Sequence, residues 1–364
     1  MPSYVFAGSL TRPAPNYREA NGRGITTLRI DDESGRLEVV STYAAIDDTG
    51  WLSVDAARRR LYAVCEDPDA GQSLVASFAV GPEGGLTELN RQPTGGQTAC
   101  HMSLSGDGRF LLVANYNADV AAGAPDGAIA VLSIGPNGEL LPASALLHHH
   151  GRGPHPARQE RSHAHCIVAA PDGGLVYVTD LGLDRIMVYA LGADGRLSHQ
   201  AENDFALAPG SGPRHLVFQP DGRRLFVVME LSPSVVSLEV GASGAMTLID
   251  SLAIPRNGNA IVQPAGILLG PDGRLFVGLR ECNEILGIAV DGSGKLAPTG
   301  RWPSGGATPR DFVLSPDGRH LIVANQDSDN LTSFPVSRGT LGAPMQNLAV
   351  GTPMAVAIAD FGRS

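Results

Sequence analysis

Cysteine and positive charge are both scarce in this chain of 364 residues. The four cysteines, Cys65, Cys100, Cys166 and Cys282, are far apart, and none belongs to a Cys-x-x-Cys pair. This usage argues against a disulfide framework or a zinc knuckle and indicates a reducing compartment, the cytoplasm. Lysine and arginine number 27 against 37 aspartates and glutamates, for a formal charge of −10. We therefore expect no general surface for nucleic acid or for anionic membranes.

Several signatures of targeting, membrane insertion and cofactor binding are also missing. No apolar run approaches the ~18 residues of a membrane-spanning helix, and residues 1–4 have no basic or apolar signal-peptide region. No Gly-x-Ser-x-Gly elbow, Gly-x-x-x-x-Gly-Lys loop or strand-to-helix dinucleotide fingerprint occurs, so we expect no cofactor. No segment keeps a 3.6-residue apolar period, so helices should be minor.

What the sequence does contain is a repeated turn. The tetrapeptide Pro-Asp-Gly-Arg or Pro-Asp-Gly-Gly occurs four times, with a degenerate copy at residues 105–109 and a weaker one at 54–58. An apolar run follows each turn and another precedes most of them, which is the pattern of a β-hairpin. The turn aspartates lie 45 to 65 residues apart, at Asp55, Asp107, Asp172, Asp221, Asp272 and Asp317.

Each turn belongs to a larger unit of four strands. A third apolar run follows the hairpin, and a Gly-x-Leu turn opens a fourth, as at residues 195–197. Four antiparallel strands every ~50 residues are typical of propeller blades. A seventh unit can be assembled from both ends, with residues 352–358 beside residues 4–7. We predict an all-β, seven-bladed β-propeller with four antiparallel strands per blade, a ring closed by N- and C-terminal strands, and a single domain over residues 1–364.

Repeat-equivalent positions of a propeller face one central funnel, because the innermost strands converge on the axis. Seven residues before the turn aspartates lie Cys100, His165, Arg214, Ala265 and Arg310, and one residue later lie His101, Cys166, His215, Gly266 and Asp311. Just after the second strands lie Glu66, Tyr116, Leu181, Glu230, Arg280 and Gln326. These positions hold basic and acidic residues in unlike combinations, whereas a purely structural repeat would hold similar ones. Guanidinium groups bind carboxylate or phosphate bidentately, so the funnel should bind an anion.

The same residues also have structural interpretations. They could form ion pairs or hydrogen bonds between blades, which applies to Arg214, Arg310, His165, Glu66 and the pair Glu230–Arg280. Asn115, Asp180 and Asn325 are expected to cap turns. A zinc site could use His163 and His165 with the histidines at 148–150 and 155, but no carboxylate lies at a fixed spacing from them. We therefore expect no metal.

Several segments resemble the seven-bladed propeller lactonases, a family that includes propeller-type 6-phosphogluconolactonases and the fungal 3-carboxy-cis,cis-muconate lactonizing enzyme. They are residues 99–103, 112–116, 156–165 (beginning Pro-Ala-Arg-Gln-Glu), 177–186, 212–216 (Gly-Pro-Arg-His-Leu), 230–232, 309–312 and 324–329. The resemblance implies a catalytic set of His165, Arg214, Glu230 and Arg280, which agrees with the funnel positions. We expect substrate contacts from the neighbouring funnel residues His101, His163, Arg310, Glu66 and Gln326.

The predicted function is metal-free hydrolysis of a sugar-acid lactone similar to 6-phosphogluconolactone. Arg214 and Arg280 would hold an anionic group or the oxyanion, and Glu230 or His165 would be the general base. A histidine base would give an acid limb near pH ~6.5, and an exposed glutamate one near ~4.3. One alternative is a lactone-forming cycloisomerase acting on a carboxymuconate-type diacid, and another is a non-catalytic binding propeller. The expected partner is a small anionic lactone or sugar-acid substrate, bound by a monomer or weak homodimer.

Overall fold

The repeated turns form hairpins through one aspartate and one glycine. In the computed structural model, which describes residues 3–13, 20–67, 71–116, 127–255 and 262–362, Oδ1 of Asp221 accepts the N–H of Arg223 at 3.0 Å. Gly222 has φ 71° and donates its N–H to Gln219 O at 2.9 Å. Glycine suits this position because side-chain-bearing residues rarely adopt positive φ. The carboxylates of Asp107, Asp172, Asp272 and Asp317 cap their turns in the same way.

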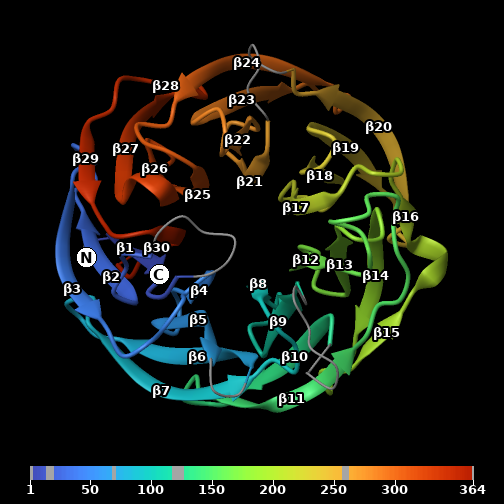
Figure 1. The fold of residues 1–364 in the computed structure, drawn as a ribbon, viewed down its shortest axis with the longest axis horizontal. Coiled ribbons are helices and arrows are strands. Elements are labelled where there is room, and N and C mark those ends of the chain that lie inside the picture. Colours follow the sequence, from blue (N-terminus) through green and yellow to red (C-terminus); the bar gives the residue numbers. More distant parts are fainter. Residues whose placement is uncertain (1–2, 14–19, 68–70, 117–126, 256–261, 363–364) are drawn as a thin grey trace.

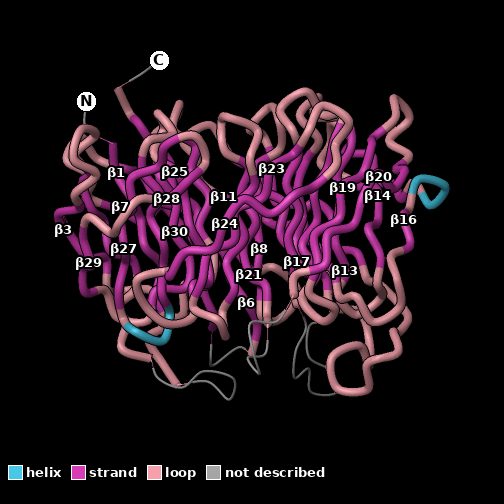
Figure 2. The backbone as a smooth tube through the Cα atoms, turned by 90° about the horizontal axis from the view of Figure 1, so that it is seen from above, coloured by secondary structure: helices cyan, strands magenta, loops and turns pink. Residues whose placement is uncertain are grey.

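The described strands form seven antiparallel sheets around a central axis (Figure 1), and they run between the two faces of the ring (Figure 2). From the axis outward, the first three blades are β4 (Leu52–Asp55), β5 (Arg60–Asp67), β6 (Gln72–Val80) and β7 (Leu86–Pro93); β8 (Ala99–Leu104), β9 (Phe110–Asn115), β10 (Ile129–Ile134) and β11 (Leu140–Leu147); and β12 (Ala164–Ala169), β13 (Leu175–Asp180), β14 (Arg185–Leu191), β15 (Leu197–His199) and β16 (Phe205–Ala206). The next three are β17 (Pro213–Phe218), β18 (Arg224–Met229), β19 (Ser234–Val240) and β20 (Met246–Ala253); β21 (Pro264–Leu269), β22 (Leu275–Leu279), β23 (Glu284–Val290) and β24 (Leu296–Pro303); and β25 (Pro309–Leu314), β26 (His320–Asn325), β27 (Asn330–Ser337), β28 (Thr340–Leu341) and β29 (Gln346–Ala349).

The seventh blade joins the two ends of the chain. It consists of β30 (Pro353–Asp360) at the axis, then β1 (Ser3–Ser9), β2 (Ile25–Ile30) and β3 (Leu37–Tyr43). Tyr4 pairs with Ala359, and Ala7 pairs with Val356, so the predicted closure is confirmed. Pairing the termini within one sheet leaves no open edge where the ring meets itself.

Helix is almost absent, as the sequence predicts. The helices of the described ranges are two 3-10 turns, η1 (Ala201–Asn203) and η2 (Gln326–Ser328), and neither could reach across a membrane.

The apolar cores lie between neighbouring blades. One cluster joins Phe6 of β1 to Leu61 and Phe78 of the next sheet, and another joins Phe276 to Phe334. Burial of these faces on their neighbours stabilises the ring through the hydrophobic effect.

A β-bulge interrupts the innermost strand of six blades near its first residue. The register with the second strand skips Cys100, His165, Arg214 with His215, Ala265 with Gly266, Arg310 and Met354. A bulge adds an unpaired residue and redirects its side chain. The skipped residues include all five that the sequence places seven positions before the turn aspartates, so the bulge is the feature that distinguishes those positions.

Candidate active site

The antiparallel pairing gathers the predicted residues on one face of the ring. Pro213, at the start of β17, pairs with Met229, at the end of β18, so Arg214 and Glu230 lie side by side. Pro264 pairs with Leu279 in the next blade, which brings Arg280 to the same face. The innermost strands begin where the second strands end, and both sets of residues therefore surround the axis.

The centre of the site is Glu230, whose carboxylate contacts three arginines. Oε1 lies 2.6 Å from Nη2 of Arg158, and Oε2 lies 3.0 Å from Nε of Arg214 and 3.1 Å from Nη2 of Arg280. The side chains of Glu230 and Arg214 are 4% and 3% exposed, that of Arg280 is 13% exposed, and that of Arg158 is 35% exposed. Arg158 is therefore the arginine of this cluster that solvent reaches most easily.

The arginines determine the ionisation of the cluster. Burial raises the pKa of Glu230, but the charges of Arg280, Arg214 and Arg158 outweigh burial and hold that pKa well below its usual range. Burial, helped by the charge of Arg280, lowers the pKa of Arg214 to about 10, so this group stays protonated at neutral pH. One carboxylate thus faces three guanidinium groups, leaving two positive charges in excess.

Three buried histidines lie next to Arg214. The ring of His215 is 5.3 Å, centroid to centroid, from the rings of both His101 and His165, and Nη1 of Arg214 lies 3.1 Å from its Nε2. Trp51 packs on this group, 4.4 Å from His101. Burial and the charge of Arg214 lower the pKa of His101 to about 3 and those of His165 and His215 well below 6.5. All three imidazoles are therefore neutral at pH 7 and add no charge to the site.

His165 has one nitrogen available for chemistry. Its Nδ1 lies 3.8 Å from Sγ of Cys100, and the ring of Tyr116 meets its ring edge-on at 5.5 Å. Among the described residues, its Nε2 makes no hydrogen bond. Burial raises the pKa of the Cys100 thiol to about 12, so Cys100 is not a nucleophile at neutral pH. A neutral imidazole with a free nitrogen can accept a proton from water.

Arg158 comes from the long connection between β11 and β12, and this loop is held firmly. The next residue, Gln159, is fully buried and donates from Nε2 to Leu181 O at 2.8 Å and to Oδ1 of Asp184 at 2.7 Å. The same Oδ1 accepts the N–H of Gly212 at 2.8 Å, two residues before Arg214. One carboxylate therefore fixes both the loop of Arg158 and the start of the strand of Arg214.

The structure brings together the four predicted catalytic residues, and His101, His163, Arg310 and Gln326 lie around them. Arg310 donates from Nη1 to Oε1 of Gln326 at 3.2 Å, and its charge contributes to the lowered pKa of Arg214. His163 stacks on Tyr116 at 4.4 Å and contacts Oε1 of Glu160 at 3.1 Å. The side chain of Glu66 lies outside the part of the chain that the structure describes.

The sequence analysis places Tyr116 at a funnel position without assigning it a role, and it does not place Arg158 in the site. Nη2 of Arg158 lies 3.2 Å from the Tyr116 hydroxyl as well as bonding Glu230. Arg158 lies in a loop without a repeat equivalent, so counting from a turn could not find it. The available signal was the Pro-Ala-Arg-Gln-Glu segment within the resemblance.

The residues expected to cap turns do so, and one of them also explains a histidine of the 148–150 run. Asn115 donates to Gly127 O at 2.9 Å, and Asn325 donates to Ser304 O at 3.1 Å. Buried Asp180 accepts Nδ1 of His149 at 2.8 Å, and the Tyr189 hydroxyl donates to Nε2 of the same ring at 2.9 Å. In the described part of the chain, no group of three or more His, Cys, Asp or Glu side chains is arranged so that it could hold a metal ion.

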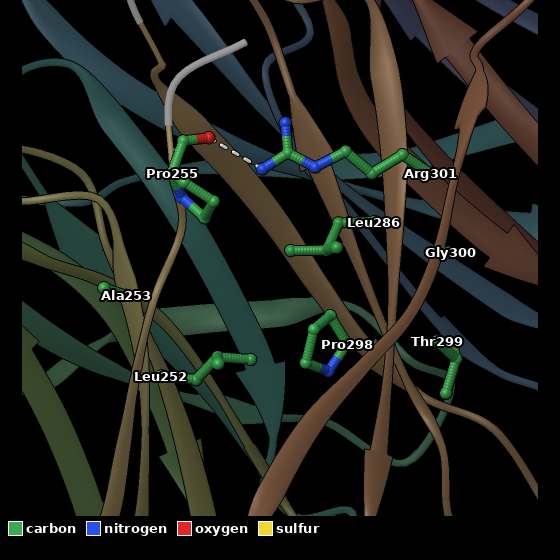
Figure 3. A pocket seen from close by; sticks show the side chains of 8 residues that line it. All are labelled: Leu252, Ala253, Pro255, Leu286, Pro298, Thr299, Gly300 and Arg301. Atoms are coloured by element: carbon green, nitrogen blue, oxygen red, sulfur yellow. Dashed lines mark hydrogen bonds between the residues drawn. The ribbon is translucent and has the colours of Figure 1, made fainter.

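Two hollows lie at the rim, away from the arginine cluster. One, of about 380 Å³, lies between β20 and β24; it is lined mainly by apolar atoms, and Arg301 closes it by donating to Pro255 O at 2.8 Å (Figure 3). The other, of about 670 Å³, is lined by residues 29–33 and 36–38 around the hairpin that joins β2 to β3. Neither contains the convergent catalytic groups found at the axis, so we place the candidate active site at the axis.

Comparison with known proteins identifies relatives along nearly the whole chain. Residues 5–358 match a family model described as lactonase, seven-bladed β-propeller. A 6-phosphogluconolactonase of Bacillus subtilis is 31% identical over 347 residues, covering 94% of this chain and 95% of the relative. A 6-phosphogluconolactonase of Formosa agariphila is 28% identical over 355 residues, covering 95% and 96%. The structure of a periplasmic gluconolactonase of Pseudomonas aeruginosa superposes with a TM-score of 0.89 at 29% identity, covering 99% of this chain and 100% of that one.

Proposed function

Because this chain belongs to the seven-bladed β-propeller lactonases, we propose that it hydrolyses the lactone of a sugar acid in the funnel around Glu230. The observation that carries the proposal is the combination of excess positive charge with a neutral, available imidazole. Three arginines surround one carboxylate, and His165 lies beside Arg214 with Nε2 unoccupied by any described residue. Such a site can stabilise a developing oxyanion and accept the proton of an attacking water.

In the proposed reaction, the water oxygen forms a bond to the lactone carbonyl carbon and loses a proton to Nε2 of His165. The carbonyl oxygen becomes an oxyanion, which the guanidinium groups of Arg214 and Arg280 stabilise. The ring C–O bond then breaks, and the imidazolium of His165 returns the proton to the leaving alkoxide. The product is the open-chain acid, and no metal or cofactor is required. Removing one oxyanion donor from such a site typically lowers kcat by about 10²–10³-fold.

The geometry favours His165 over Glu230 as the base. Both oxygens of Glu230 are already bound by arginines, and those charges hold its pKa well below that of a free glutamate. Nε2 of His165, by contrast, makes no hydrogen bond with any described residue, so it is the group that a water molecule can reach. We therefore propose that Glu230 orients the three arginines and that His165 moves the proton.

Burial changes the expected pH dependence. The acid limb near pH ~6.5 expected for a histidine base assumed an unperturbed ring, but burial and Arg214 hold the pKa of His165 well below that value. The limb near ~4.3 is expected for an exposed glutamate base, whereas Glu230 is 4% exposed. The activity should therefore persist to lower pH than an unperturbed histidine base would allow.

The test uses the purified protein after exhaustive chelation of divalent ions. It is offered 6-phosphogluconolactone, gluconolactone and 3-carboxy-cis,cis-muconate, and acid release or ultraviolet absorbance is followed beside enzyme-free controls. We expect lactone hydrolysis above the spontaneous rate, and a His165→Asn variant that folds normally should lose it. Consumption of the muconate without lactone hydrolysis would support cycloisomerisation, and turnover of no substrate would support a binding propeller.

We also propose a cellular compartment and an assembly state for this protein. The four cysteines form no disulfide, which supports a reducing compartment such as the cytoplasm. We propose that residues 1–364 act as one domain, as a monomer or weak homodimer, because each funnel residue named above comes from a single ring. Light scattering across a concentration series would measure the mass in solution.

A further inference from the structure

Arg158 differs from the other two arginines that bind Glu230. Arg214 and Arg280 share Oε2, and their side chains are 3% and 13% exposed, whereas Arg158 binds Oε1 alone and is 35% exposed. Arg214 follows the start of an innermost strand and Arg280 follows a second strand, but Arg158 comes from the loop between β11 and β12. A ligand entering the site from solvent therefore reaches Arg158 more easily than the two buried guanidinium groups.

Arg158 also keeps unused hydrogen-bond donors. Its contacts to Glu230 at 2.6 Å and to the Tyr116 hydroxyl at 3.2 Å both involve Nη2. Within the described ranges, its Nε and Nη1 make no hydrogen bond. Since an arginine carries five N–H donors, three of them remain for a ligand.

The charge around these donors suits a doubly charged group. Three guanidinium groups face one carboxylate, and the neighbouring imidazoles are neutral, so two positive charges remain without a counter-charge. A phosphate monoester carries about −1.5 to −2 at pH 7 and could neutralise this excess. A neutral sugar lactone could not, and it would leave the excess charge partly desolvated.

The loop that carries Arg158 is built as a fixed support. Fully buried Gln159 accepts the N–H of His155 at 3.0 Å through Oε1 and donates to Leu181 O and Asp184 through Nε2. Ordering such a loop before binding removes an entropy penalty that a flexible arginine would incur when the ligand arrives.

We propose that Arg158 binds a phosphate on the lactone, remote from the scissile ester bond, and thereby sets the preference for phosphorylated over neutral sugar lactones. This inference rests on the proposed lactonase function and adds the substrate class. Arg214 and Arg280 then remain with Glu230 and the reacting carbonyl, while Arg158 recognises the charged end of the same molecule.

The test compares kcat/KM for 6-phosphogluconolactone and for gluconolactone in the wild type, Arg158→Gln and Arg158→Lys. Loss of Arg158 also changes the surroundings of Glu230, so both rates can fall, and the informative quantity is their ratio. We expect Arg158→Gln to lower the ratio of phosphorylated to neutral rates by about 10- to 100-fold, the range for a hydrogen bond to a charged group. Arg158→Lys keeps the charge but loses the planar fork, and it should restore part of the ratio.

Arg161→Gln is the matched control. It removes the same charge from the same loop, but Arg161 pairs with Glu160, at 3.5 Å, and not with Glu230. The ratio should stay within about twofold of the wild type. Equal losses on both lactones in Arg158→Gln, or an equal change of ratio in Arg161→Gln, would overturn the inference.

Ligand binding separates this inference from the proposed function. Calorimetry with 6-phosphogluconate and gluconate measures the preference without any turnover. If the wild type hydrolyses neither lactone, the proposed function fails, but a preference for 6-phosphogluconate that Arg158→Gln removes still supports the phosphate site. If the wild type hydrolyses a lactone but does not prefer the phosphorylated ligand, the role of Arg158 is contradicted while the proposed function stands.

Discussion

Replacing Glu230 with glutamine should destabilise the whole ring, because it leaves three guanidinium groups without their counter-charge. Removing one partner of a buried ion pair costs about 3–5 kcal/mol, since the remaining charge stays desolvated. The pairs with Arg214 and Arg280 belong to this class, with side chains 3% and 13% exposed. The pair with Arg158, 35% exposed, adds at most about 1 kcal/mol after solvent screening.

The corresponding change in melting temperature follows from the chain length. At an unfolding entropy of about 2.1 cal/mol/K per residue, a loss of about 3–5 kcal/mol lowers Tm by roughly 4–7 °C for 364 residues. Differential scanning calorimetry of the wild type and Glu230→Gln at pH 7 measures this difference directly.

The effect should also depend on pH with a defined sign. The folded-state pKa of Glu230 is lowered below the unfolded value of about 4.3, so its stabilisation is complete above about pH 5. That stabilisation is lost as pH falls through the folded-state pKa. The Tm difference between wild type and Glu230→Gln should therefore be constant from pH 6 to 8 and should shrink below pH ~4.

Glu160→Gln is the control, because it is the same chemical change at a carboxylate that is 43% exposed and contacts His163 and Arg161. It should lower Tm by no more than about 1–2 °C. Equal melting temperatures for the two variants, or a Glu230→Gln difference that does not change with pH, would refute the argument that Glu230 is a buried counter-ion.

Three further predictions follow from the same geometry. His165→Asn should lower kcat by at least about 10²-fold with Tm nearly unchanged. The wild-type kcat/KM should stay flat from pH 7 to 6, because the lowered pKa keeps His165 neutral in that range. An acid limb near pH ~6.5 in stopped-flow or steady-state profiles would contradict this expectation. Activity should survive exhaustive chelation, and loss of turnover that one specific metal restores would show that a metal takes part. Asp184→Asn keeps the shape but places an NH₂ where the carboxylate now accepts hydrogen bonds from Gln159 and Gly212. We expect the free energy of unfolding, measured by thermal denaturation, to fall by about 1–3 kcal/mol and kcat/KM to fall as well. Wild-type values for both would mean that Asp184 does not position Arg158 and Arg214.

The fold could be read from the sequence because its signals are local. The Asp-Gly turn between residues 221 and 222 needs only its own carboxylate and a positive φ, and the same chemistry repeats at a regular interval. Since each turn marks the same hairpin of a blade, its period predicts the number of blades. The closing pair of strands followed because one unit was missing and both chain ends carried the strands to build it.

The candidate site could be read only in part. The repeat predicts that Arg214, Glu230 and Arg280 face one axis, and the structure places both arginines within 3.1 Å of Oε2 of Glu230. The same reasoning could not find Arg158, because a loop between blades has no repeat-equivalent position from which to count. It also left the general base open. The sequence places Glu230 and His165 near the axis, but it does not show that arginines already contact both carboxylate oxygens of Glu230.

Sequence alone therefore determined the architecture and the positions that face the axis, since turn chemistry and apolar alternation act over a few residues. Only the tertiary structure decided which of those positions carry charge and which are available. The bulge that redirects His165 and Arg214 is a feature of strand pairing within a blade. The lowered pKa of His165 depends on burial and on Arg214 of the next blade, and the loop of Arg158 is anchored where buried Gln159 bonds Leu181 and Asp184. Desolvation and Coulomb interactions depend on distance in space rather than along the chain, and those distances exist only once the ring has closed.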